Sequence, residues 1–134
     1  MLDLDSFKRI NDTYGHDIGD RYLREFATAL DRMPEEHCYV ARRSDDEFSM
    51  CIFGCREKAK INGLVHELER FVSQNTVRLS DEEETVIKFS GGYIVTDNLS
   101  ETLEELMKKA DEALYIRKKG GKGSIGEYCN GSIT

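Results

Sequence analysis

Apolar residues recur along the chain at two spacings, one typical of helices and one typical of strands. Helical spacing predicts a short helix through Phe7, Ile10 and Tyr14, and longer helices over about 17–33, 56–74 and 101–119. Strand-like runs lie at 1–5, 38–41, 48–53, 86–95 and 125–129. This order predicts an α/β (α+β) fold, with a mixed central sheet that contains an antiparallel hairpin and is flanked by helices.

Three details refine this prediction. The pair Gly91-Gly92 interrupts the strand at 86–95, which permits either a bulge or the close approach of another backbone segment. The acidic run 81–84 is expected to be an exposed turn. The last helix has an apolar face made of Leu103, Leu106, Met107, Ala110 and Leu114.

Composition indicates one domain over 1–134 that contacts neither a membrane nor nucleic acid. The 134 residues are 34% charged and 39% hydrophobic, and no apolar run approaches the roughly 20 residues that span a bilayer. A net charge of −7 argues against general binding to nucleic-acid phosphates. The four cysteines form no CxxC pair, so we expect a reducing, cytoplasmic location, with Cys38 and Cys51 as small core residues.

The segment Ser44-Asp45-Asp46-Glu47 places three carboxylates between two strand-like runs. A hairpin tip with this many acids suggests a cation site, because hard cations bind oxygen ligands. A solvated polar turn is the simpler alternative for this segment alone.

A second acidic pair stands at the start of the chain. Asp3 and Asp5 are two residues apart on a predicted strand, so both side chains face one side and suit a shared cation. An EF-hand loop does not fit, because Lys8 stands where a glycine is required. A phosphate-binding Walker loop also fails, since Ile116 replaces the leading glycine before Gly121-Lys122.

Polar residues are dense between the first two predicted helices, over 11–20. Helix capping explains part of this pattern, with Gly15 as a helix stop and His16 or Asp17 near an N-cap. The segment also extends a longer motif: Asp3-x-Asp5-x-Phe7-Lys8-x-x-Asn11-Asp12-x-x-Gly15-His16-x-x-Gly19-Asp20.

This motif resembles the opening signature of GGDEF domains, the diguanylate cyclase family. The resemblance continues through the hairpin, through Ser90-x-Gly92, and through Ala110-Asp111-x-Ala113-Leu114-Tyr115-x-x-Lys118, so it covers almost the whole chain. It implies a fold akin to nucleotidyl cyclases, which agrees with the element order read from periodicity.

The resemblance implies a role for several residues. Asp3, the backbone carbonyl of Leu4 and Asp46 match ligands of Mg²⁺, or of Mn²⁺ in its place. Glu47 matches an acid that is assigned to catalysis beside the metal. Such cations neutralise a triphosphate and activate a 3′-hydroxyl for attack on the α-phosphorus.

The resemblance also implies GTP as the substrate. Asn11 and Asp20 match the pair that reads guanine, whose N–H groups a carboxylate accepts. Lys118 and Lys122 match the two basic positions that hold the distal phosphates, and the second of these is usually arginine in the family. The backbone amides from Ser6 to Lys8, at the start of a helix, match a phosphate cradle.

The chain departs from the family at the glycines that give it its name, because Ser44-Asp45 replace Gly-Gly. Asp tolerates positive φ at a cost of about 1 kcal/mol, so we expect the fold to survive. Nucleotide binding is affected more strongly: two unit charges 4 Å apart repel by roughly 4 kcal/mol at an effective dielectric of 20. A micromolar ligand has roughly 8 kcal/mol of binding free energy, so affinity should fall towards millimolar.

Two further departures concern regulation. The family's Arg-x-x-Asp motif for product inhibition is replaced by Glu35-Glu36-His37-Cys38, so we expect no feedback binding there. The helix and half-strand that precede Asp3 in family members are missing, and an upstream sensory or partner domain is expected outside this chain.

Three functions are compatible with this pattern. The favoured one is a degenerate domain that binds GTP and Mg²⁺ as a regulatory module, with little or no cyclase activity. The second is an active diguanylate cyclase, in which a homodimer condenses two GTP molecules into cyclic di-GMP. The third is a purely structural interaction or dimerisation domain.

Overall fold

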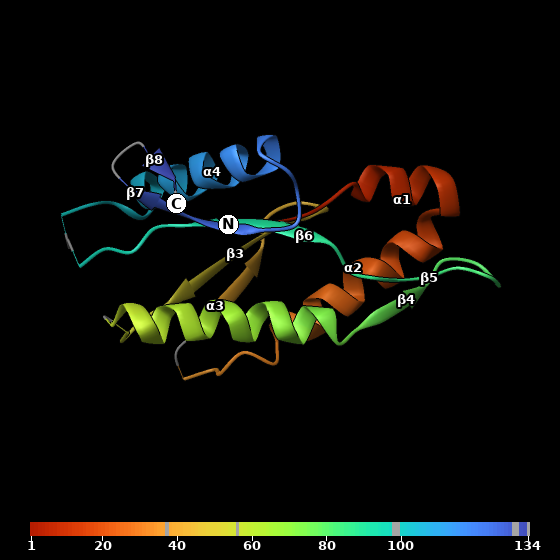
Figure 1. The fold of residues 1–134 in the computed structure, drawn as a ribbon, viewed down its shortest axis with the longest axis horizontal. Coiled ribbons are helices and arrows are strands. Elements are labelled where there is room, and N and C mark those ends of the chain that lie inside the picture. Colours follow the sequence, from red (N-terminus) through yellow and green to blue (C-terminus); the bar gives the residue numbers. More distant parts are fainter. Residues whose placement is uncertain (37, 56, 98–99, 130–131, 134) are drawn as a thin grey trace. The chain divides into compact units, whose positions relative to one another are not determined.

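The computed structural model describes residues 1–36, 38–55, 57–97, 100–129 and 132–133. It divides into two compact units, which are built from interleaved segments of the chain. The first unit contains Met1–Asp5, Arg43–Ser49 and Lys88–Thr134, and the second contains Ser6–Arg42 and Met50–Ile87. Figure 1 shows the chain with its elements labelled.

The first unit is a mixed sheet with one long helix. Its strand order is β3-β1-β6-β7-β8, in which the central β1 pairs antiparallel with both neighbours and β6 pairs parallel with β7. The strands are β1 (Leu2–Leu4), β6 (Phe89–Tyr93), β7 (Ile125–Cys129), β8 (Ser132–Ile133) and the start of β3 (Glu47–Ile52). The helix is α4 (Leu103–Lys119), which packs on β6 and β7.

Helix α4 begins and ends at recognisable signals. The Thr102 side chain accepts a hydrogen bond from the Glu105 N–H, and the Glu105 carboxylate accepts one from the Thr102 N–H, which makes a capping box. Three basic residues in its last turn, Arg117, Lys118 and Lys119, complement the negative end of the helix dipole.

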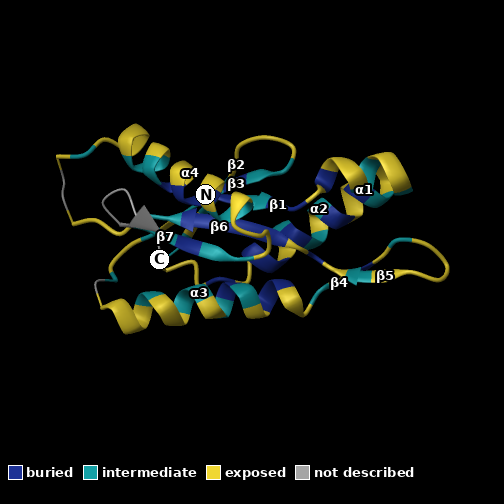
Figure 2. Cartoon of the chain, turned by 45° about the horizontal axis from the view of Figure 1, so that its top comes forward, coloured by how far each residue is buried: buried dark blue, intermediate teal, exposed yellow. Residues whose placement is uncertain are grey.

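Close contact between α4 and β6 depends on Gly92. A β-carbon at this position would lie 2.1 Å from the Leu114 nitrogen and 2.4 Å from the Ala110 oxygen. Met1, Ala110 and Leu114 form a buried cluster beside it, and Figure 2 shows α4 buried on one side and exposed on the other. Of the two outcomes predicted for the Gly91-Gly92 pair, close backbone approach is the one that the structure has.

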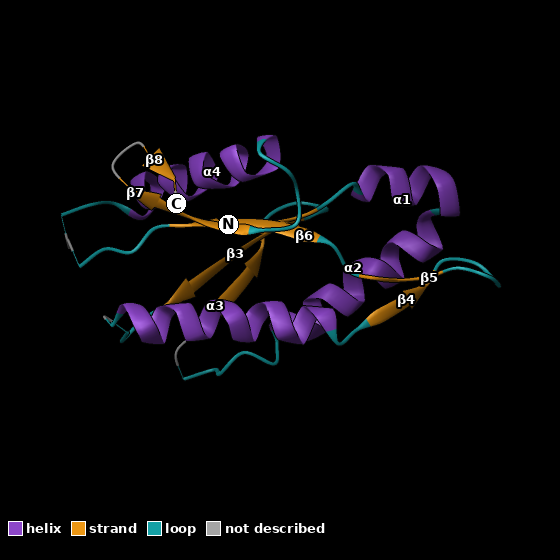
Figure 3. Cartoon of the chain, viewed as in Figure 1, coloured by secondary structure: helices purple, strands orange, loops and turns teal. Residues whose placement is uncertain are grey.

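The second unit consists mainly of helices that pack on one another. Helix α2 contacts α1, α3 and β4. The fully buried side chains of this unit include Tyr22, Phe26, Leu30, Val72 and Val77. A separate two-stranded antiparallel sheet joins β4 to β5 (Figure 3). The elements are α1 (Phe7–Tyr14), α2 (His16–Leu30), β2 (Cys38–Arg42), the end of β3, α3 (Lys58–Ser73), β4 (Thr76–Arg78) and β5 (Glu84–Val86).

The predicted fold class is confirmed, and four details of the prediction were wrong. The run 86–95 is not one strand: β5 ends at Val86 in the second unit, and β6 begins at Phe89 in the first. Helix α2 ends at Leu30, not near Met33. The two cysteines predicted in the core are not buried, because Cys51 is exposed and Cys38 is half-buried, and Leu103 is 68% exposed at the start of α4. The exposed turn is confirmed for residues 81–83, which close the β4–β5 hairpin, whereas Glu84 is exposed but begins β5.

Ser6 is strained at the start of α1. Its φ of 57° and ψ of 33° are left-handed, and it is the one residue other than glycine with positive φ among those the structure describes. We expect Ser6→Gly to raise the free energy of unfolding by about 0.5–1 kcal/mol, because glycine adopts this conformation without steric cost. Urea denaturation of the variant measures this, with Ser6→Ala as a control that keeps the strain and should give no gain.

Candidate functional site

Three polar side chains of the first unit share one face of the sheet. In the strand register, Asp3 of β1 lies opposite Glu47 of β3 and opposite Ser90 of β6. Directly opposite residues in antiparallel strands project to the same face. Gly92, two residues beyond Ser90, projects to that face as well and meets α4, so α4 covers the face that bears Asp3.

The end of the hairpin is tied to β1 beside Asp3. The Leu4 N–H donates a hydrogen bond to the Asp46 backbone oxygen at 3.0 Å. The carboxylates of Asp46 and Glu47 are half-buried, and that of Asp46 is close enough to Asp3 to affect its titration. The predicted metal ligands Asp3, Leu4 and Asp46 are therefore neighbours in the first unit.

Lys118, in the last turn of α4, pairs with Asp3. Its Nζ donates to Asp3 Oδ2 at 2.5 Å, and the Asp3 side chain is 13% exposed. Burial raises the pKa of Asp3 above its ordinary value, the Asp46 carboxylate raises it further, and the Lys118 ammonium acts in the opposite direction. One cation thus partly neutralises two closely spaced acids.

The residues present fit a divalent cation in one respect. Asp3 Oδ1 is buried and accepts no hydrogen bond in the described structure, which leaves a carboxylate oxygen available as a ligand. Among the residues that the structure describes, no three His, Cys, Asp or Glu side chains are placed to hold a metal together. A site here would therefore combine two carboxylates with a backbone carbonyl, such as that of Leu4.

The hairpin turn is made without glycine and without backbone strain. The Arg43 N–H donates to the Glu47 oxygen at 2.8 Å, and the Ser44 N–H donates to the same oxygen at 3.3 Å. Ser44 and Asp45 are exposed, and neither has positive φ. The cost of about 1 kcal/mol expected for positive φ at this turn is therefore not incurred.

The predicted guanine-reading residues lie in the second unit. Asn11 comes from α1 and Asp20 from α2, and these two helices pack together. The Asn11 amide lies directly over Gly19: a β-carbon on Gly19 would be 1.7 Å from Asn11 Oδ1. Because Gly19 has no side chain, the Asn11 amide can lie against the α2 backbone directly before Asp20.

The remaining predicted residues are exposed. Lys8 lies in the first turn of α1, where the N-cap residue Ser6 makes no side-chain hydrogen bond to the helix. The first N–H groups of α1 are therefore not capped by that side chain. Lys122 lies between Gly121 and Gly123, which have φ of 117° and 91°. His37, within the segment that replaces the inhibition motif, is outside the described residues.

Ser90 belongs to the Ser90-x-Gly92 match in the sequence, and the family resemblance implies no role for it. It is fully buried, and its hydroxyl bonds to both Asp5 and the Gly123 backbone. A serine in the middle of a buried strand was the signal, since a buried hydroxyl requires a partner.

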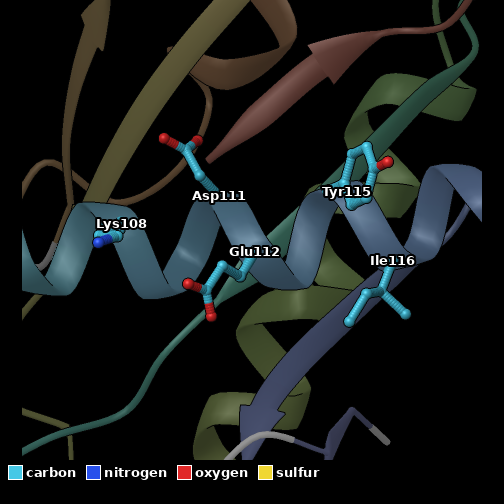
Figure 4. Close-up of a pocket in the computed structure, with 5 residues that line it drawn as sticks. All are labelled: Lys108, Asp111, Glu112, Tyr115 and Ile116. Atoms are coloured by element: carbon cyan, nitrogen blue, oxygen red, sulfur yellow. The ribbon is translucent and has the colours of Figure 1, made fainter.

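A shallow surface depression lies away from these residues, on the exposed side of α4. Lys108, Asp111, Glu112, Tyr115 and Ile116 line it (Figure 4). They recur at helical spacing along one helix, and they include none of the predicted site residues.

Of the helices that the structure describes, none is both long enough and apolar enough to cross a membrane.

Comparison with known families agrees with the motif. The family described as "Diguanylate cyclase, GGDEF domain" matches residues 1–124. The response regulator PleD of Caulobacter vibrioides is 32% identical over 126 residues, which are 93% of this chain and 28% of PleD. Diguanylate cyclase DosC of Escherichia coli is 30% identical over 125 residues, or 93% of this chain and 27% of DosC. The chain therefore spans less than a third of these relatives.

Solved structures show the same fold. The GGDEF domain of DgcB from Caulobacter crescentus, in complex with c-di-GMP, has a TM-score of 0.82 and 31% identity, and the match covers 95% of this chain and 74% of that one. The diguanylate cyclase SiaD from Pseudomonas aeruginosa, in complex with its activator SiaC, has a TM-score of 0.84 and 29% identity, covering 94% and 47%.

Proposed function

The chain belongs to the GGDEF family of diguanylate cyclase domains, and from this premise we propose that it is a GTP- and Mg²⁺-binding regulatory module with little or no cyclase activity. Its family makes it a domain of cyclic di-GMP signalling.

The observation that supports binding most directly is the environment of Asp3. This buried carboxylate has one oxygen without a hydrogen-bond partner, a second acid beside it, and Lys118 on the other oxygen. Asp3, Asp46 and the Leu4 carbonyl would hold Mg²⁺, which when bound neutralises triphosphate charge and activates a 3′-hydroxyl. Lys118 then exchanges Asp3 for a phosphate oxygen, a role that suits its point charge.

The weak point of the site for turnover is Asp45. In the family, glycine at this position lets the nucleotide approach the backbone, whereas Asp45 adds a negative charge where phosphate oxygens come close. The nucleotide would then bind weakly and out of the alignment needed for in-line attack. Binding without turnover is the expected consequence.

An active diguanylate cyclase is the second candidate, and the turn favours it. Ser44 and Asp45 form the hairpin without positive φ, so the backbone of this turn does not require the family's glycines. Such an enzyme would work as a homodimer, with one GTP on each subunit. A structural interaction domain is the third candidate, and the preserved carboxylates and Lys118 argue against it.

Calorimetric titration of GTP with and without Mg²⁺, beside an assay for cyclic di-GMP, tests the proposal. We expect Mg²⁺-dependent binding weaker than micromolar and little or no product. Sustained product formation would establish the active enzyme in its place. Absence of binding at millimolar GTP would favour the structural domain.

Gly19→Ala should separate guanine recognition from folding. The new methyl group would displace the Asn11 amide, and losing its hydrogen bonds to guanine should weaken GTP binding about tenfold. Stability should be maintained or raised, because alanine is about 1 kcal/mol better than glycine inside a helix. Calorimetry and urea denaturation measure the two effects, and unchanged GTP affinity would remove Asn11 from the guanine site.

A further inference from the structure

A chain of hydrogen bonds joins Asp5, directly after β1, to Ser90 of β6 and to the loop 120–124 of the first unit. The Gly123 N–H donates to Ser90 Oγ at 3.0 Å, and the Ser90 hydroxyl donates to Asp5 Oδ1 at 2.7 Å. Ser90 is completely buried and Asp5 is 7% exposed. The spacing of Asp3 and Asp5 suggested a shared cation, but Asp5 Oδ1 is bonded to Ser90 instead. The roles that the family resemblance assigns to nucleotide and metal ligands use neither Asp5 nor Ser90.

The direction of this chain is determined by chemistry. A serine hydroxyl has one hydrogen, and a peptide N–H can only donate, so Ser90 accepts from Gly123 and must give its own hydrogen to Asp5. The Asp5 carboxylate is the terminal acceptor, and consecutive bonds of this kind polarise and strengthen one another. Asp5 therefore acts on Gly123 through Ser90, although it does not touch the loop.

Both ends of the chain are held by backbone structure. The Asp5 N–H donates to the Lys88 oxygen at 2.9 Å, directly beyond the β1–β6 pairing. The Gly91 N–H donates to the Ser124 oxygen at 3.0 Å, so adjacent residues of β6 bind adjacent residues of the loop. The loop is tied at Gly123 and Ser124 to the same sheet that carries Asp3.

The loop needs such a tie because of its composition. Gly120, Gly121 and Gly123 surround Lys122, and glycine loses more conformational freedom on ordering than any other residue. Gly121 and Gly123 both have positive φ, and the Cβ positions at both are open, so side-chain packing at these glycines does not hold the backbone there. A specific hydrogen bond to the Gly123 amide restricts the backbone directly beside Lys122.

We propose that Asp5 and Ser90 are positioning residues for phosphate binding: through the Gly123 amide they hold Lys122 in place for the distal phosphates of a bound nucleoside triphosphate. The functional part of this inference rests on the proposed GTP binding. Asp5 would then stabilise the loop, while Asp3 would remain available as a ligand of the cation.

The test measures the affinities for GTP and for guanosine monophosphate, together with the rate of hydrogen exchange at the Gly123 amide. Ser90→Ala removes both hydrogen bonds, and Ser124→Ala makes the same change in the loop at a residue that uses only its backbone. With Mg²⁺ present, Ser90→Ala should weaken GTP binding about tenfold. It should leave binding of guanosine monophosphate, which lacks the distal phosphates, within twofold of wild type. Hydrogen exchange at the Gly123 amide should accelerate, and Ser124→Ala should change none of these.

Asp5→Asn provides a second variant that keeps the size of the side chain and weakens only its acceptor. A smaller loss of GTP affinity is expected, again without loss for the monophosphate, and it replaces Ser90→Ala if that variant does not fold. Equal losses for both ligands would overturn the positioning role, because a general structural defect affects them alike. Faster exchange at Gly123 with unchanged GTP affinity would overturn it too.

Titration with inorganic triphosphate, which has no guanine, tests the positioning role independently of the proposed GTP binding. If the wild type binds no GTP, the proposed function fails, and titration with triphosphate and Mg²⁺ still examines the loop. Triphosphate binding that is weakened by Ser90→Ala supports the positioning role without guanine recognition. Absence of triphosphate binding, or binding that Ser90→Ala leaves unchanged, overturns it.

Discussion

Replacing Gly92 with alanine is expected to lower the free energy of unfolding by about 3 kcal/mol, at the upper end for overpacked sites. The new methyl group would meet backbone atoms of α4, at 2.1 Å from the Leu114 nitrogen and 2.8 Å from the Ala113 carbon. Backbone atoms cannot rotate away as side chains can, so α4 would have to move off β6. Urea denaturation of the variant gives the change directly.

Gly63→Ala is the matched control. Gly63 lies within α3, and no atom lies within 4 Å of the position that its β-carbon would take. The same substitution there should raise stability by about 0.5–1 kcal/mol, because alanine favours the helix. A loss below about 1 kcal/mol for Gly92→Ala would mean that α4 can shift from β6 at little cost.

Restoring both family glycines, Ser44→Gly with Asp45→Gly, is expected to raise GTP affinity at least about tenfold. The gain comes from removing a carboxylate near the phosphates, and it should shrink at high salt because Asp45 is exposed and its charge is screened. Calorimetry with Mg²⁺ at two salt concentrations measures both effects. Stability should fall slightly, since each glycine adds freedom to the unfolded chain.

Single variants distinguish charge from space. Asp45→Asn removes the charge at nearly constant size and should provide most of the gain, whereas Ser44→Gly alone should provide little. The opposite order would mean that bulk at the turn obstructs the nucleotide. If the double variant binds GTP no better than wild type, Asp45 is not the obstacle.

Local pattern predicted the helices well and the strands less well. Helices α1, α3 and α4 lie within two residues of the expected ranges, because each has an apolar face, and α1 and α4 also end at a glycine, Gly15 and Gly120. The run 86–95 was misread because its apolar residues continue across the point where the chain leaves one sheet for another. Periodicity reports which residues are buried, and not which sheet buries them.

The sequence by itself determined the family, the fold class and the identity of the candidate residues. Those conclusions rest on a motif and on spacings within single elements, which a linear pattern contains. Tertiary structure alone decided that the hairpin turn is unstrained, that Lys118 pairs with Asp3, and that Ser90 links Asp5 to Gly123. Asp5 and Ser90 are 85 residues apart, and Lys118 and Asp3 are 115 apart. Contacts at such separations arise from strand register and helix packing, which no local spacing encodes.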